Sequence, residues 1–325
     1  MNSQWATIDQ FIEQANSILV TSHIDPDGDA LGSTLAMAYV CKQWGKRVIC
    51  VNESPIPRRF SFLPKIDEVR RPEQVNESFE YVIVVDAADR KRVGETVQQC
   101  FHPQAQILNI DHHRTNDEFG TINVVMPNVC ATAGILYQWM KNSAKVRWDA
   151  TLATYLYTGI LTDTGGFRYS NTSADVLRMA AQLVDYGAQA DEIADYALES
   201  SSYEQIRCLE RALSTLSLSE DGQIAWLSLS LADVKWIQAN DADVEGIVDI
   251  PRKIEGVDVG IFFRETSEST VKVSFRSKKK VDVSKIAQEF GGGGHPRAAG
   301  CTVEGGLEAV KKQVLKRVKA ELEWL

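Results

Sequence analysis

Acidic and histidine residues gather at the ends of four apolar segments in the first half of the chain. Three of these segments have the composition of β-strands, and the fourth has helical spacing. They end in HIDPDGD (residues 23–29), VVD (84–86), DHH (111–113) and TDTGG (162–166). Carboxylates and imidazoles are the side chains that hold Mn²⁺, Mg²⁺ or Zn²⁺. Because the loops after parallel strands share one edge of a sheet, we expect these motifs to form one polynuclear metal site.

The first motif places three metal-ligating residue types in one short loop. His23, Asp27 and Asp29 follow each other at spacings of four and two. Pro26 stiffens the loop and Gly28 lets it turn sharply, so that the three side chains could face one point. The alternative is an ordinary polar turn in which Asp29 caps the helix that follows it.

The DHH motif is the most informative of the four. Acidic residues such as Asp86 commonly end strands in α/β proteins, but two adjacent histidines after a buried strand have little structural use. The chain has five histidines, and four of them lie in motifs: His23, His112, His113 and His295. This concentration favours a functional site over a set of unrelated turns.

So many ligands suit two divalent ions rather than one. Two ions roughly 3.5–4 Å apart need a bridging carboxylate and separate ligands on each side. Such a pair deprotonates a water near neutral pH and neutralises charge that builds on phosphoryl oxygens. The motifs therefore predict hydrolysis at phosphorus.

A run of four glycines precedes a histidine and an arginine in GGGGHPRAAG, residues 291–300. Without Cβ atoms the chain can press its amides against an anion, and His295 and Arg297 add donors for phosphate or carboxylate. The run lacks the GK[ST] ending of a P-loop and the setting of a GxGxxG motif, which disfavours ATP and NAD binding. The alternative is a flexible hinge.

The charge of the chain limits its nucleic-acid partners. The formal net charge is −9, which argues against electrostatic binding of long nucleic acid. A local basic patch opposes this sign and could hold short phosphate-bearing substrates; it comprises Arg264, Lys272, Arg276, Lys278, Lys279, Lys280 and Arg297. Alternatively, its lysines are the solvated end of an edge strand that they keep from aggregating.

Length and composition indicate a two-domain globular protein. A chain of 325 residues can bury two proper cores. No apolar run approaches the roughly 18 residues of a membrane span, and the N-terminus lacks the features of a signal peptide. The six cysteines are scattered, as buried thiols of a reducing compartment are. We therefore expect a cytoplasmic protein without membrane association.

Alternating strand and helix patterns predict an α/β fold with a doubly wound parallel sheet in the first half. A capping box of Thr7 and Gln10 predicts the start of a short first helix. The expected strands are 17–22, 47–51, 81–85, 106–110 and 121–125, with a helix at 30–44 and a largely helical stretch at 131–186. A second pattern predicts strands 224–229, 257–264 and 271–276 and helices 231–238, 283–290 and 307–325. We therefore divide the chain into a first domain (1–187), a helical connector (188–216) and a smaller α/β domain (217–325).

Together the motifs resemble those of the DHH/DHHA1 phosphoesterase family. HIDPDGDA, VVDAAD, DHH, TDTGG and GGGGHPRAAG occur in the family's order and span nearly the whole chain. The resemblance implies an N-terminal DHH domain that binds two Mn²⁺ ions, for which Mg²⁺ or Co²⁺ could substitute. It also implies a DHHA1 domain that closes over the substrate, with a cleft between the domains.

The resemblance assigns roles residue by residue. One metal ion would be held by His23, Asp27 and Asp86. The other would be held by Asp29, Asp86, His112 and Asp163, with Asp86 bridging. His113 would lie beside the scissile phosphate, Asp111 would orient the histidines, and Asp25 receives no metal. The substrate side would comprise Gly293, Gly294, His295, Arg297, Arg264, Ser274 and Arg276, and His295 could also protonate the leaving oxygen.

The two-domain layout resembles the stand-alone branch of oligoribonucleases and 3′-phosphoadenosine 5′-phosphate (PAP) phosphatases. This implies a Mn²⁺-dependent enzyme that degrades RNA of two to five nucleotides to nucleoside monophosphates and dephosphorylates PAP. The alternatives are a phosphodiesterase for linear or cyclic dinucleotides, such as cyclic di-AMP, pApA or pGpG, and a nucleotide-binding regulator without catalysis. The sequence leaves the order of substrates and the oligomeric state, a homodimer included, open.

Overall fold

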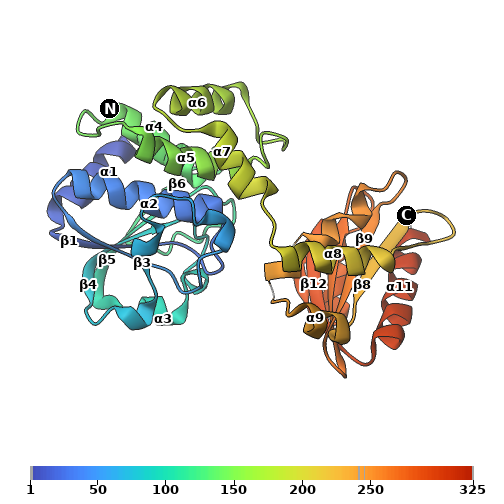
Figure 1. Ribbon diagram of the computed structural model, residues 1–325. Coiled ribbons are helices and arrows are strands. Elements are labelled where there is room, and N and C mark those ends of the chain that lie inside the picture. Colours follow the sequence, from blue (N-terminus) through green and yellow to red (C-terminus); the bar gives the residue numbers. More distant parts are fainter. Residues whose placement is uncertain (1–2, 241, 245, 324–325) are drawn as a thin grey trace. The chain divides into compact units, whose positions relative to one another are not determined.

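The protein consists of two compact α/β units that divide between Ser200 and Ser201 (Figure 1). The computed structural model describes residues 3–240, 242–244 and 246–323. Within these residues, none of the helices combines the length and the apolar character that a membrane crossing needs. Each unit has its own hydrophobic core, as the length of the chain predicts.

The described residues of the first unit form a sheet of six parallel strands in the order β3-β2-β1-β4-β5-β6. The strands are β1 (Ser17–Thr21), β2 (Arg47–Val51), β3 (Val69–Arg70), β4 (Phe79–Val85), β5 (Phe101–Asp111) and β6 (Ile122–Val125). The strand order reverses between the neighbours β1 and β4. In parallel α/β sheets such a reversal opens a crevice at the carboxyl ends of the two strands.

Helices cover both faces of this sheet, but unequally. The helices are α1 (Ser3–Gln14), α2 (Gly28–Gln43), α3 (Glu95–Gln98), α4 (Thr132–Asn142), α5 (Ala150–Asp163), α6 (Ala174–Asp185) and α7 (Ala190–Ala194). Alternate residues of β4 face opposite ways, so Ile83 packs with α1, α2, α4 and α5, while Val84 packs with α3. The predicted doubly wound α/β sheet is confirmed.

Helices α2 and α5 run close together because glycines lie at their contact. A Cβ atom on Gly32 would overlap the carbonyl oxygen of Tyr155 in α5. A Cβ atom on Gly159 would lie 2.6 Å from a carboxylate oxygen of Asp29. The start of α2 therefore lies beside the end of α5, where Asp163 is located.

The second unit is built on a mixed sheet. In its described residues the strand order is β11-β12-β10-β9-β8-β7, and β8 and β9 form its parallel pair. The strands are β7 (Ser217–Leu218), β8 (Ile224–Leu229), β9 (Val259–Ser267), β10 (Thr270–Ser277), β11 (Gly293–His295) and β12 (Ala298–Glu304). The helices are α8 (Tyr203–Ser214), α9 (Leu231–Ile237), α10 (Val283–Glu289) and α11 (Leu307–Glu323). Helices α10 and α11 pack on one face, and α8 and α9 cover part of the other.

Several local expectations are corrected by the structure. Helix α1 is already formed at Ser3, so Thr7 lies inside it and the capping box is wrong; the apolar face of Trp5 and Ile8 extends the helix towards the N-terminus. The predicted connector contains α7, a turn of π-helix (Asp195–Glu199) and α8, and the boundary between the units falls within it. The last two residues of the predicted final helix, 324–325, lie outside the described residues. Strands β3, β7, β11 and β12 escaped prediction because they are very short or rich in glycine and alanine.

Gly32→Ala tests the close packing of α2 and α5. The new methyl group must push the two helices apart, and overpacking of this kind costs about 1–3 kcal/mol. We expect a lower midpoint of urea unfolding, followed by tryptophan fluorescence. Gly306→Ala is the control, because its Cβ would meet no atom within 4 Å among the described residues. Equal midpoints for the two variants would contradict the packing argument.

Candidate metal centre

The acidic and histidine motifs converge at the carboxyl edge of the parallel sheet. His23 follows β1, Asp86 follows β4 and His112 follows β5, while Asp29 lies in the first turn of α2 and Asp163 ends α5. Strands β1 and β4 flank the reversal of strand order. The motifs therefore occupy the position at which α/β sheets bind ligands.

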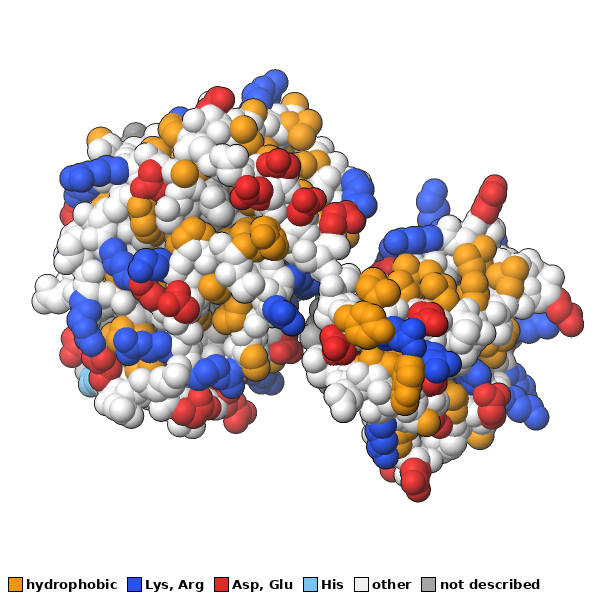
Figure 2. All heavy atoms as spheres, viewed as in Figure 1, with side chains coloured by type: hydrophobic (Ala, Val, Ile, Leu, Met, Phe, Trp, Pro, Cys, Tyr) orange, Lys and Arg blue, Asp and Glu red, His pale blue; other side chains and the backbone are white. Residues whose placement is uncertain are grey.

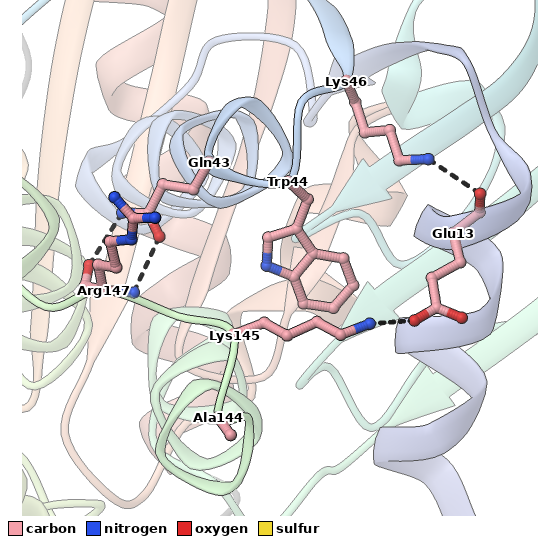
Figure 3. Close-up of a pocket in the computed structure, with 7 residues that line it drawn as sticks. All are labelled: Glu13, Gln43, Trp44, Lys46, Ala144, Lys145 and Arg147. Atoms are coloured by element: carbon pink, nitrogen blue, oxygen red, sulfur yellow. Dashed lines mark hydrogen bonds and ion pairs between the residues drawn. The ribbon is translucent and has the colours of Figure 1, made fainter.

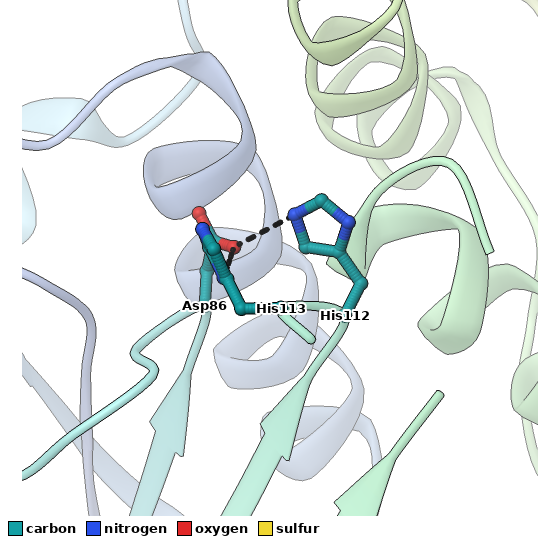
Figure 4. A group of neighbouring side chains, drawn as sticks. All are labelled: Asp86, His112 and His113. Atoms are coloured by element: carbon teal, nitrogen blue, oxygen red, sulfur yellow. Dashed lines mark ion pairs between the residues drawn. The ribbon is translucent and has the colours of Figure 1, made fainter. Parts of the chain in front are cut away.

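Asp86 lies at the centre of this group, and Figure 4 shows it beside His112 and His113. Its Oδ2 is 3.5 Å from Nε2 of His23, and its Oδ1 is 3.6 Å from Nε2 of His112. Oδ1 is also 3.7 Å from Nδ1 of His113. The two oxygens thus face imidazoles from different motifs, as those of a carboxylate that bridges two cations would.

The backbone at Asp86 adopts an uncommon conformation that aims this carboxylate. Its φ of +56° lies in the left-handed region, which residues other than glycine rarely occupy. The amide of Asp86 donates to the carbonyl of Ile110 at 3.0 Å, and the side chain is buried. Strain of this kind persists where the surrounding structure enforces it, often at functional sites.

The imidazole of His23 presents Nε2 to the site. Its Nδ1 donates to the carbonyl oxygen of Ile24 at 2.6 Å, which assigns the proton to Nδ1. Burial disfavours a charge on the ring, but hydrogen bonds to Asp27 and Asp86 outweigh burial and raise the pKa of His23 to about 10. A cation bound at Nε2 would take the place of that second proton.

Asp27 is the N-cap of α2. Its Oδ1 accepts hydrogen bonds from the amides of Asp29 and Ala30, each at 3.0 Å, and lies 3.8 Å from Nε2 of His23. Burial opposes ionisation, but the hydrogen bonds from His23 and the backbone amides lower the pKa of Asp27 to about 2. Asp27 is therefore an anion at neutral pH.

Asp29 caps a different helix from the one that the sequence suggested. Its Oδ2 accepts from the amide of Thr132 at 2.6 Å, and its Oδ1 accepts from the amide of Ala133 at 2.8 Å, both in the first turn of α4. Ser33 adds a third donor at 3.1 Å. The expectation that Asp29 caps α2 is wrong, because Asp27 fills that position.

Burial and mutual repulsion make this group of carboxylates hard to ionise. Burial, followed by the charges of Asp86 and Asp163, raises the pKa of Asp29 well above its ordinary value. Burial, followed by the charges of Asp86 and Asp27, raises the pKa of Asp163 to about 8. His112 lies between Asp86 and Asp163: its Nε2 is 3.6 Å from Oδ1 of Asp86 and 3.1 Å from Oδ2 of Asp163. Positive charge at the centre of this group would relieve the repulsion.

His113 is held by the carboxylate of Asp111, next to the cluster. Its Nδ1 donates to Oδ1 of Asp111 at 2.7 Å, and this bond raises the pKa of His113. Burial opposes the charge of Asp111, but hydrogen bonds from His113 and Asn116 lower its pKa. Asp25 lies outside the cluster, where its carboxylate accepts from the hydroxyl of Ser54 at 2.9 Å.

The donor set fits divalent cations. Among the described residues, three groups hold ligand atoms within 4.8 Å of one another: His23–Asp27–Asp86, Asp29–His112–Asp163 and Asp86–His112–His113. Asp86 and His112 each occur in two of these groups, so the groups adjoin. Carboxylate oxygens and imidazole nitrogens held this close together are the donors that a pair of such ions requires.

Thr132 and Asn116 support the cluster from outside the motifs. The hydroxyl of Thr132 donates to Oδ1 of Asp86 at 3.0 Å. The amide of Asn116 donates to Oδ2 of Asp111 at 2.6 Å. Asn116 lies three residues after the DHH motif, so its proximity in sequence could have identified it. Thr132 is 46 residues from Asp86, and nothing in the sequence links the two.

Part of the predicted substrate set shares one face of the second sheet. Ser274 and Arg276 lie two positions apart in β10, so their side chains share a face. Strand β12 lies between β10 and β11. Ser274 and Gly293 both pair with Gly300 of β12, and Arg276 and His295 both pair with Ala298. Directly opposite residues of antiparallel strands share a face. Arg276 also forms an ion pair with Asp249, at 3.3 Å.

The remaining predicted substrate residues are placed differently. Arg264 of β9 lies on the same face, but it is buried. Arg297 lies in the turn between β11 and β12, where its Nη1 donates to the carbonyl of Val281 at 2.8 Å. Gly294 faces the opposite side, where a Cβ would lie 2.6 Å from the carbonyl oxygen of Ala298. Two of the four glycines, Gly293 and Gly294, therefore belong to an edge strand paired with β12.

A separate surface hollow of about 430 Å³ lies at the other end of α2 from Asp27 (Figure 3). It is lined by Glu13, Gln43, Trp44, Lys46, Ala144, Lys145 and Arg147. Glu13 already engages both lysines, since its carbonyl accepts from Lys46 at 2.9 Å and its carboxylate pairs with Lys145. The lining residues come from outside the motifs, so we assign the chemistry to the sheet edge and not to this hollow.

Known families and proteins match the chain over most of its length. The family model described as "DHH family, N-terminal domain" matches residues 17–160, and that of the DHHA1 domain matches residues 231–323. A protein of Thermus thermophilus named bifunctional oligoribonuclease and PAP phosphatase NrnA is 36% identical over 94% of this chain and 90% of its own. The protein of that name from Bacillus subtilis is 27% identical over 95% of each chain. The crystal structure of an exopolyphosphatase-related protein from Bacteroides fragilis is similar with a TM-score of 0.89 and 26% identity, over 99% of this chain and 98% of that one.

The raised pKa values predict how pH affects the stability of the metal-free protein. Asp163 (pKa about 8, ordinarily 3.8) and His23 (about 10, ordinarily 6.5) hold protons in the folded state that the unfolded chain releases. The stability that these protons contribute is lost as the pH rises through the folded pKa values. We expect the unfolding temperature in EDTA to fall between about pH 6 and about pH 8.5.

Added Mg²⁺ should reverse this trend, because its ligands must be deprotonated. The increase in unfolding temperature on adding Mg²⁺ should be larger at the higher pH, as measured by scanning calorimetry. Asp163→Asn is the matched variant and should flatten the pH dependence in EDTA. A metal-free protein whose unfolding temperature rises with pH would argue against this electrostatic picture.

Proposed function

The chain belongs to the DHH/DHHA1 phosphoesterase family, and from this premise we propose that it is a Mn²⁺-dependent hydrolase of short RNA and of PAP. It would cleave oligoribonucleotides of two to five nucleotides to nucleoside monophosphates and remove one phosphate of PAP. The observation that carries the proposal is the carboxylate of Asp86, which faces His23 through one oxygen and His112 through the other. The Thermus thermophilus relative, whose name states both activities, supports the choice of substrates.

The residues that would hold the cations follow from the groups at the sheet edge. One ion would bind His23, Asp27 and Asp86. The other would bind Asp29, Asp86, His112 and Asp163, so that Asp86 serves both. When bound, such ions supply Lewis acidity, which activates water and neutralises charge on a phosphoryl group.

His113 is suited to work on the substrate rather than to bind metal through Nδ1. Asp111 occupies that nitrogen, and the side chain of His113 is 32% exposed, so Nε2 is the atom left for a substrate oxygen. Asp111 raises the pKa of His113, which favours a protonated ring that could donate to a phosphoryl oxygen. Asn116 fixes Asp111 and, through it, the orientation of the ring.

The second unit would bind the part of the substrate that is not cleaved. Ser274, Arg276 and His295 present donors on one sheet face. Arg297 is an exposed residue whose guanidinium, besides its bond to Val281, could donate two hydrogen bonds to a phosphate. His295 would donate to the same phosphate or protonate the leaving oxygen. Glycine has no Cβ atom, and at Gly291 and Gly293 nothing lies within 4 Å of where one would be, so the backbone there would be open to a nucleotide.

Surface charge favours short substrates. On the face shown in Figure 2, basic and acidic side chains are interspersed. With a net charge of −9, the protein would gain little electrostatic attraction from the additional phosphates of a long RNA. Binding would then depend on the few nucleotides that contact the site directly.

A substrate panel tests the proposed function. Initial rates with Mn²⁺ would be compared for RNAs of 2, 3, 5 and 24 nucleotides, PAP, pApA, cyclic di-AMP and polyphosphate. We expect PAP to be hydrolysed, and the rate to fall about tenfold or more, or about 1.4 kcal/mol in the barrier, between the 2-mer and the 24-mer.

Each of the other outcomes of the panel would favour a different function. Equal rates on the 2-mer and the 24-mer would favour an open exonuclease groove. A clear preference for cyclic di-AMP or pApA would favour a dinucleotide phosphodiesterase. Turnover restricted to polyphosphate would agree with the name of the Bacteroides fragilis protein. Nucleotide binding without turnover of any compound would indicate a regulator.

Asp86→Asn tests the bridging role. Asparagine keeps the size of the side chain and tolerates the left-handed backbone, so the fold should be preserved. We expect both Mn²⁺ ions to be lost and the activity to fall by more than the about 10- to 100-fold that a residue supporting a metal site costs. Asp27→Asn, at a residue that we assign to one cation, is the comparison and should lose less metal. Full metal content in Asp86→Asn, measured by elemental analysis, would refute the two-metal arrangement.

A further inference from the structure

The first turn of α4 contacts the two most deeply buried of the carboxylates that we assign to the cations, Asp29 and Asp86. The amide of Thr132 donates to Oδ2 of Asp29 at 2.6 Å, and its hydroxyl donates to Oδ1 of Asp86 at 3.0 Å. The amide of Ala133 adds a bond to Oδ1 of Asp29 at 2.8 Å. Asp29 and Asp86 lie on different elements, α2 and the end of β4, so Thr132 joins two otherwise separate parts of the site.

These bonds are well suited to hold negative charge. The amides at a helix start have no partner within the helix, and the helix dipole adds partial positive charge there. The amide of Thr132 is such a donor, and Asp29 satisfies it. The first turn of α4 thus offsets part of the cost of burying Asp29 before any cation is bound.

The hydroxyl of Thr132 constrains the orientation of Asp86. It occupies one lone-pair direction of Oδ1, so the carboxylate cannot rotate without losing a buried hydrogen bond. Oδ2 and the other side of Oδ1 then face His23 and His112. The hydroxyl thus fixes the rotation of the carboxylate in which one oxygen lies towards His23 and the other towards His112.

We propose that Thr132 is a positioning residue that sets the relative geometry of the two cation sites. Its amide anchors Asp29, assigned to one ion, and its hydroxyl orients Asp86, assigned to both. The role rests on the proposed two-metal function but is distinct from it, because Thr132 offers no ligand atom to either ion in this arrangement. Its effect should therefore appear in cation affinity and not in the number of ligands.

The decisive comparison is between Thr132→Val and Thr132→Ser. Valine keeps the buried shape and the backbone amide but removes the hydroxyl, whereas serine keeps the hydroxyl. Mn²⁺ binding to the metal-free protein is measured by isothermal titration calorimetry, and kcat and KM for a dinucleotide are measured at saturating Mn²⁺. We expect Thr132→Val to bind Mn²⁺ about 10- to 100-fold more weakly and to lose kcat with little change in KM. In Thr132→Ser, the Mn²⁺ affinity and kcat should both stay within about threefold of the wild-type values, a difference of less than about 1 kcal/mol.

Thr158→Val is the matched control. Thr158 is also fully buried in a helix, but its hydroxyl donates to the carbonyl of Thr154 at 2.8 Å rather than to a carboxylate of the site. This variant should retain wild-type Mn²⁺ affinity. If Thr132→Val does not fold, Thr132→Ala compared with Thr132→Ser gives the same contrast, because both lack the methyl group and differ in the hydroxyl.

The possible outcomes separate this inference from the function on which it rests. Wild-type Mn²⁺ affinity in Thr132→Val overturns the positioning role and leaves the two-metal function intact. A Thr132→Ser variant as impaired as Thr132→Val also overturns it, because the methyl group would then be what matters. A wild-type protein that binds no divalent cation overturns the proposed function and the positioning role together.

Discussion

The rest of the structure depends on the repulsion between carboxylates that are held together at the buried edge of a parallel sheet. Ligand atoms of Asp29 and Asp163 lie within 4.8 Å of one another, and Asp86 adjoins both. Two like charges about 4 Å apart repel by about 4 kcal/mol at the effective dielectric constant near a protein surface. A fold keeps such a group only if helix termini, imidazoles, bound protons or cations compensate. In the protein itself, helix termini and imidazoles contact the carboxylates, and the raised pKa values of Asp29 and Asp163 favour bound protons.

The fold supplies this compensation through the packing of its helices. Glycines let α2 and α5 approach until the start of one lies beside the end of the other, which brings Asp29 to Asp163. Helix α4 then directs its first amides at Asp29, and the reversal of strand order between β1 and β4 leaves room at the sheet edge. The helix packing and the strand order that build the core therefore also concentrate negative charge at a place where a cation can bind.

Much of the site could be predicted from local sequence. Strand ends in a parallel sheet share an edge, so His23, Asp86 and His112 could be placed together once β1, β4 and β5 were recognised. The strands themselves were predictable because their apolar runs have a strong pattern, and β2 and β8 begin and end where expected. Prediction was wrong where the sequence pattern is weak. The glycine-rich strand β11 was missed. The start of α1 was misplaced because a polar capping signal competed with an apolar face.

The sequence by itself determined which chemical groups are available and which strand ends carry them, because residue type and periodicity are local properties. The tertiary structure alone decided which donors hold those groups. Asp29 caps α4 and not α2, from a distance of 103 residues, and Thr132 reaches Asp86 across 46. Such pairings depend on how helices cross and how closely they pack, and these are set by the whole core. The sequence motifs identify the candidate ligand residues, whereas the contacts that orient these residues form only when distant segments fold against each other.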